Sequence, residues 1–142
     1  MTPAEELRHL LQGAGADEAP ARLDELTGDC PAGAPRALGR ARDVLRVVLE
    51  HQTGPWPDLD RWQAMLPAWF VEACVDDRRV RNCVLDRWSL RAWLHWLQPD
   101  QRQWRWWDAR PVDETHLRVQ LLPAAETYLR GSLEWLLTVA GR

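Results

Sequence analysis

The chain has 142 residues, of which 46% are hydrophobic and 27% are charged, and this balance excludes an intrinsically disordered protein. Its length suits a single domain, and no apolar run reaches the roughly 18 residues that a membrane span requires. The formal net charge is −3 and the 3 cysteines form no CxxC pair. Because the N-terminus also lacks a basic segment followed by an apolar one, we expect a cytoplasmic protein.

The first 35 residues predict a helical arm that is loosely attached to the rest of the chain. Thr2 suits the N-cap of a first helix that Gly13 ends. Leu23 and Leu26 favour a second, weak helix over residues 19–27. The stretch GDCPAGAP is rich in glycine and proline, as linkers are. We therefore expect an arm over residues 1–35 and a tryptophan-rich globular domain over residues 36–142.

Residues 36–97 show the three- and four-residue spacing of apolar side chains that is typical of amphipathic helices. This spacing predicts a helix over 36–52 and a helix after Asp58 or Asp60 that Pro67 kinks or divides. It also predicts a helix after Asp76 or Asp77 that includes Cys83 and Trp88, and a helix in the stretch LRAWLHWLQP that Ser89 caps and Pro99 ends.

Beyond residue 100 the apolar period changes from helical to alternating. Leu117, Val119 and Leu121 alternate with polar residues, which predicts a β-hairpin of residues 103–110 with 115–122. An isolated hairpin is marginally stable unless one face packs on something else, and an apolar helix from Pro123 to about Ala140 is the expected cover. The predicted fold class is therefore α+β: a mainly helical single domain of five or six helices with a C-terminal β-hairpin packed on the last helix.

Some tryptophans exceed what this core requires. Strand alternation puts Trp104 and Trp106 of the stretch RQWRWWDAR on the inner face of the hairpin and leaves Trp107 on the outer face. Trp56 lies in a loop between two prolines, and Trp96 lies off the apolar stripe of its helix. With the neighbouring arginines they form the expected partner-binding surface, whose residues are Trp107, Arg105, Arg118, Trp96, Trp56 and Arg110.

Motifs of known catalytic sites are absent from the sequence. It contains no GxxxxGK[ST], GxSxG or HExxH motif, and its cysteines and histidines lack the spacing of metal ligands. We expect no catalytic residue, no metal and no cofactor. The predicted function is a non-catalytic protein–protein interaction module, an adaptor or a subunit of a larger bacterial assembly, that binds another chain or itself.

Two alternatives stay open. Residues 78–110 hold 8 arginines against 3 acids, whereas residues 1–77 hold 7 arginines against 14 acids. Arginines interleaved with tryptophans suit single-stranded nucleic acid, which binds through phosphate contacts and base stacking. The other alternative is an enzyme whose site has no familiar motif. No contact with a membrane is expected.

Overall fold

The structure, a computed structural model, describes residues 1–75 and 88–142. These residues form an α+β fold, as predicted. Its helices are α1 (Pro3–Gln12), α2 (Ala34–Glu50), α3 (Leu59–Met65), α4 (Ala68–Ala73), α6 (Leu90–Leu97) and α7 (Gly131–Ala140), and its strands are β1 (Asp24–Asp29), β2 (Trp104–Pro111) and β3 (His116–Pro123). Most of the helix expected after Asp76 or Asp77, with Cys83, lies outside the described residues. Trp88, expected in the same helix, is described and is not helical, since its carbonyl accepts the N–H of Val75 at 3.0 Å.

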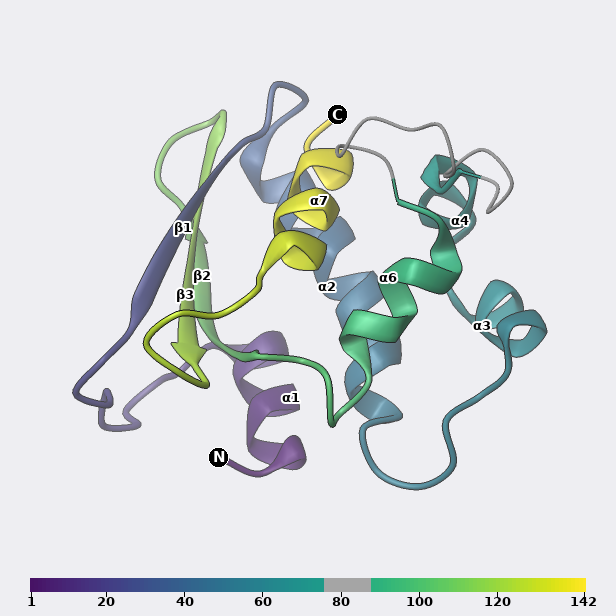
Figure 1. The fold of residues 1–142 in the computed structure, drawn as a ribbon. Coiled ribbons are helices and arrows are strands. Elements are labelled where there is room, and N and C mark those ends of the chain that lie inside the picture. Colours follow the sequence, from purple (N-terminus) through teal and green to yellow (C-terminus); the bar gives the residue numbers. More distant parts are fainter. Residues whose placement is uncertain (76–87) are drawn as a thin grey trace.

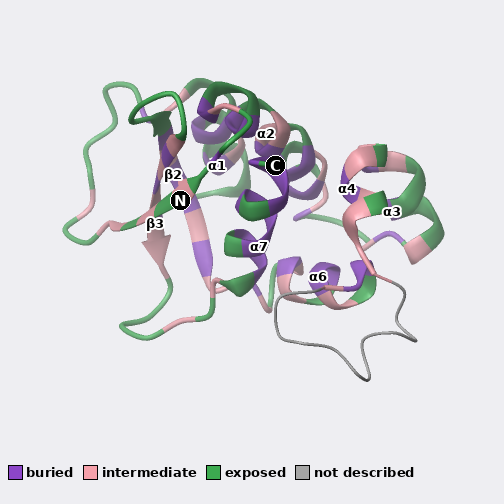
Figure 2. Cartoon of the chain, turned by 90° about the horizontal axis from the view of Figure 1, so that it is seen from above, coloured by how far each residue is buried: buried purple, intermediate pink, exposed green. Residues whose placement is uncertain are grey.

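The elements stack in three layers (Figure 1). The sheet forms one outer layer, and α1, α2 and α7 lie against it. Helices α3, α4 and α6 lie on the far side of α2 and α7. Apolar side chains of α2 and α7 therefore face both neighbouring layers, and Figure 2 shows buried residues on most of the circumference of α7.

Local signals predicted most of the helices well. Thr2 and Glu5 form a capping box at the start of α1, and Gly13 follows its last residue with a φ of 83°. Of the two outcomes expected at Pro67, a kink or a division, the structure shows the division, because Pro67 separates α3 from α4. Ser89 accepts a hydrogen bond from the backbone N–H of Ala92 at 3.1 Å and caps α6. These interactions are all local, which is why the sequence alone reveals them.

The helix expected over residues 19–27 is wrong, because residues 24–29 form strand β1. Its burial alternates along the strand, with Leu26 and Gly28 half-buried and Glu25, Thr27 and Asp29 exposed. Strand β1 pairs antiparallel with β3, so that Leu26 lies opposite Val119. The pairing partner lies more than 90 residues away in sequence, and the local spacing of two leucines therefore carried no information about it.

The hairpin exists, but its packing differs from the prediction. Strands β2 and β3 pair antiparallel, and β1 adds a third strand in the order β1-β3-β2. Helices α1 and α2 cover the hairpin, whereas α7 packs mainly on α2 and β1. Helix α7 also begins at Gly131 instead of near Pro123. Residues 1–35, expected as a loosely attached arm, thus contribute one helix and one strand that both contact the remainder of the chain.

Candidate interaction surface

Trp107 is buried, so its expected exposure is wrong. Trp106 lies opposite Leu121 and Asp108 lies opposite Gln120, which makes Trp107 the extra residue of a β-bulge. The bulge interrupts the strand alternation on which the prediction depended. The Trp107 ring packs on His9 with a centroid distance of 4.4 Å, and only 8% of the residue is exposed. Trp107 therefore belongs to the contact between β2 and α1.

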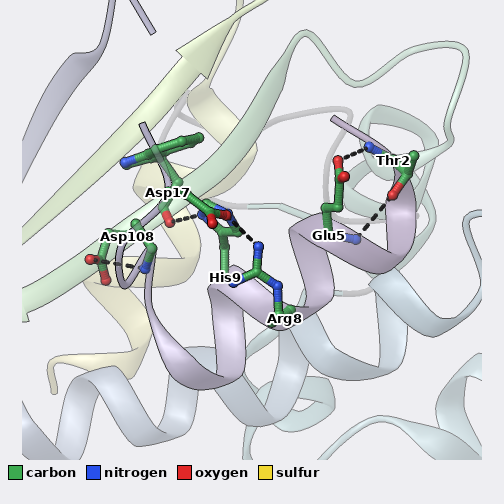
Figure 3. Close-up of polar contacts among 8 residues, drawn as sticks. Thr2, Glu5, Arg8, His9, Asp17 and Asp108 are labelled. Atoms are coloured by element: carbon green, nitrogen blue, oxygen red, sulfur yellow. Dashed lines mark hydrogen bonds and ion pairs between the residues drawn. The ribbon is translucent and has the colours of Figure 1, made fainter. Parts of the chain in front are cut away.

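Polar contacts of α1 and of the loop after it secure this part of the fold (Figure 3). Nδ1 of His9 donates to the backbone carbonyl of Trp107 at 2.8 Å, while its Nε2 lies 2.8 Å from Oδ2 of Asp17. Arg8 forms an ion pair with the same carboxylate. Hydrogen bonds from Arg8 and then His9 lower the pKa of Asp17. The Ala14 N–H also donates to Asp108 at 3.2 Å, so the loop closes over the bulge.

Arg102, which opens the arginine and tryptophan stretch, is not available to a partner. Its guanidinium forms a bidentate pair with Glu6, with Nη1–Oε2 and Nη2–Oε1 distances of 2.5 and 2.6 Å. Both side chains are only 1% exposed. Trp104 and Trp106 are also buried. These residues therefore present neither free phosphate contacts nor stacking surfaces, and Arg78, Arg79, Arg81 and Arg87 lie outside the described residues.

The three arginines of the predicted surface, Arg105, Arg110 and Arg118, are on the hairpin. Arg110 and Arg118 lie directly opposite each other on β2 and β3, beside a hollow of about 260 Å³ that Asp108 and Gln120 also line. Arg118 is 3.7 Å from Glu25, and Arg110 is exposed. Arg105 is half-buried, and burial, aided by the nearby charge of Arg102, lowers its pKa. The hairpin thus brings Arg110 and Arg118 together, without an accompanying tryptophan.

Trp56 covers a core side chain. Its ring lies 4.8 Å from that of Trp62, centroid to centroid, and Trp62 is fully buried. A hollow of about 350 Å³ beside them is lined by apolar groups together with Asp58, Arg91 and His95. The loop tryptophan is therefore half-buried, and its contact with the core accounts for it without a partner protein.

Trp96 lines an apolar pocket, unlike the other predicted tryptophans. Helix α6 buries Leu90, Trp93, Leu94 and Leu97, so Trp96 lies off that stripe, as expected. It meets residues from the segment before α7 and from its first turn. The pocket has a volume of about 220 Å³ and is lined by Trp88, Trp96, Gln101, Leu129, Gly131 and Ser132.

The chain holds this pocket in a defined shape. Leu129 is 58% exposed, and its backbone N–H donates to Oε1 of Gln103 at 2.9 Å. A Cβ at Gly131 would lie 3.4 Å from the Trp88 ring, so the indole packs at van der Waals distance from the start of α7. The exposure of Leu129 was not predictable from the sequence, because an apolar helix was expected from Pro123 onward, whereas α7 begins at Gly131.

No protein-family model, curated protein or solved structure matches this chain. Within residues 1–75 and 88–142, no group of three or more His, Cys, Asp or Glu side chains is placed to hold a metal ion. Over the same ranges, no helix has the length and apolar character needed to cross a membrane.

Proposed function

We propose that the protein is a non-catalytic protein–protein interaction module and that it holds one apolar side chain of its partner in the pocket between Trp88, Trp96 and Leu129. The observation that carries this proposal is the pocket itself, which combines two indoles with a leucine that is 58% exposed. Aromatic side chains in small, dry pockets are the usual anchors of protein interfaces.

The size of the pocket favours a side chain over a cofactor. Pockets for small molecules and cofactors usually enclose about 300–1,000 Å³, whereas this one encloses about 220 Å³. Among the described residues that line it, Gln101 and Ser132 have polar side chains, and the others are two tryptophans, a leucine and a glycine. A leucine, methionine or phenylalanine from a partner surface matches both the volume and the apolar lining. We infer a cytoplasmic setting, in which Cys30 and Cys74, both free thiols in the structure, stay reduced.

The test compares two substitutions in the pocket with one control. Leu129→Asp and Trp96→Ala remove its apolar lining, and Val112→Asp introduces the same charge at an equally exposed residue of the hairpin turn, which is 50% exposed. Proteins retained by each immobilised variant from an extract of the native host are quantified, and the partner is then purified for affinity measurement.

We expect the pocket variants to bind the partner at least about tenfold more weakly, as the loss of an interface anchor does. Val112→Asp should bind like the unmodified protein. Equal binding by all three variants would refute the proposal, and so would an equal loss in all three. Thermal melting of each variant separates a lost contact from a lost fold.

A further inference from the structure

The two edges of the sheet differ in how their backbone groups are satisfied. At the β2 edge, α1 supplies partners: Glu6 accepts the N–H of Trp106 at 2.7 Å, and His9 donates to the carbonyl of Trp107 at 2.8 Å. Strand β1 forms the other edge, and Figure 1 shows it at the border of the sheet. An edge strand without such partners is a template for a further strand.

The pairing pattern identifies which groups of β1 are open. Cys30 follows the strand and donates its N–H to the carbonyl of Thr115 at 2.7 Å, so even-numbered residues of β1 exchange hydrogen bonds with β3. The N–H and C=O groups of Glu25 and Thr27 therefore point away from the sheet. Within the two described ranges, no residue is hydrogen-bonded to them. The carbonyl of Asp29 lies against Gly141, where an added Cβ would be only 2.7 Å away.

A groove runs beside this open edge. It has a volume of about 290 Å³, and it lies between β1 and the exposed strip of α7. Its lining residues are Leu26, Thr27, Gly28, Asp29, Glu134, Leu137 and Thr138. The Gly141 contact closes one end of the groove, while Arg22, bonded to the carbonyls of Ala125 and Glu126, lies near the other. The space suits an extended segment of about five residues, roughly 17 Å long.

The acidic side chains of β1 indicate which kind of segment can bind in this groove. Strand β1 carries three acids and no basic residue. Glu25 lies 3.7 Å from Arg118 and Asp29 lies 3.3 Å from His116, both on β3, but the two acidic side chains are 52% and 87% exposed and are open to a second cation from the other side. Self-pairing of two copies centred on Thr27 would place Glu25 opposite Asp29 of the second copy. Like charges directly opposite each other destabilise a sheet. The acids therefore disfavour a second copy and favour basic residues at both ends of an added strand.

We infer that β1 and α7 form a docking groove for an extended basic segment of a partner protein, which adds to the sheet as an antiparallel fourth strand. Its central residue pairs with Thr27, and its two basic residues, four positions apart, extend their side chains toward the carboxylates of Glu25 and Asp29. Main-chain pairing ends before Asp29, because the carbonyl of that residue lies against Gly141. The two residues between them that face inward are apolar and contact Leu26 and Leu137. This surface rests on the proposed function, because it assumes an interaction module, but it is separate from the Trp96 pocket.

The probe is the capped peptide acetyl-Arg-Val-Thr-Val-Arg-amide, titrated into the full chain and followed by amide chemical shifts and calorimetry. Two matched peptides carry one N-methyl group each. Methylation of the central threonine removes the N–H that donates to Thr27, whereas methylation of the valine before it removes an N–H that points to solvent. A fourth peptide replaces both arginines with glutamate.

We expect shifts confined to residues 25–29 and 134–138, with binding about tenfold weaker for the threonine-methylated peptide and unchanged for the valine-methylated one. Glu25→Lys should weaken binding of the arginine peptide severalfold, whereas Glu72→Lys on α4 makes the same charge change in a distant layer and should leave it unaltered. The Leu129→Asp variant should bind the peptide as the unmodified protein does. A result that refutes the Trp96 pocket can therefore be told apart from a result that refutes this groove.

Three outcomes would overturn the inference. The first is the absence of shifts in residues 25–29 at millimolar peptide. The second is equal binding of the two N-methylated peptides, because main-chain pairing would then play no part. The third is a dimer, seen by sedimentation, that Glu25→Lys alters, since a second copy would then occupy the edge.

Discussion

The contact between Glu6 and Arg102 yields the strongest stability prediction. Glu6 accepts two hydrogen bonds from the Arg102 guanidinium and a third from the N–H of Trp106 at 2.7 Å. Arg102 also donates to the Trp104 carbonyl and to Gln52, each at 3.0 Å. The pair thus ties α1 to β2 and to the end of α2 inside the protein.

Glu6→Ala would leave a buried guanidinium without its counter-ion and a strand N–H without its acceptor. Removal of one partner of a buried ion pair typically costs about 3–5 kcal/mol. The whole free energy of unfolding of a domain is about 5–15 kcal/mol, so this change should lower the melting temperature by roughly 10–15 °C. Replacing both residues with methionine should recover much of the loss, because no buried charge then remains unpaired.

Urea unfolding followed by tryptophan fluorescence measures these changes. The control is Glu50→Gln, which removes an exposed glutamate that pairs with Arg46 at 2.9 Å and should cost less than about 0.5 kcal/mol. A loss below about 1 kcal/mol for Glu6→Ala would refute the reasoning, since it would mean that α1 contributes little to the fold.

Three further predictions follow from buried or paired groups. Trp107→Ala should lower the free energy of unfolding by about 3 kcal/mol in a urea titration, because the Trp107 ring is buried against α1. An unchanged free energy of unfolding would show that the Trp107 side chain is exposed to solvent. The pKa of His116 is raised, chiefly by its hydrogen bond with Asp113, so its small stabilising contribution is present below pH 6.5 and is lost as pH rises through the folded pKa. His116→Gln should flatten that part of the stability curve, and a curve that keeps its slope would argue against the pair. Burial raises the pKa of Cys74 to about 12, so its alkylation by iodoacetamide at pH 8, followed by mass spectrometry, should be about a thousandfold slower than in the unfolded chain; comparable rates would show that the thiol is open.

The candidate surfaces were only partly predictable. Strand alternation is a valid guide as long as the strand is regular, and it correctly placed Trp104 and Trp106 inward. It failed one residue later, because a bulge shifts the register and nothing local marks it. Trp96 was identified by its place off the helical stripe, but the residue that completes its pocket, Leu129, comes from a segment more than 30 residues away.

The sequence by itself determined the hairpin, the buried stripe of α6 and the three helices that Thr2, Asp58 and Ser89 cap. Caps, prolines and apolar periods act over a few residues, so they can be read from the chain without knowledge of its neighbours. Only the tertiary structure decided that residues 24–29 become a strand and that Arg102 and Trp107 become core. Their partners, β3, Glu6 and His9, lie about 90–100 residues away, and the burial of a charge or an indole depends on which distant groups arrive to satisfy it.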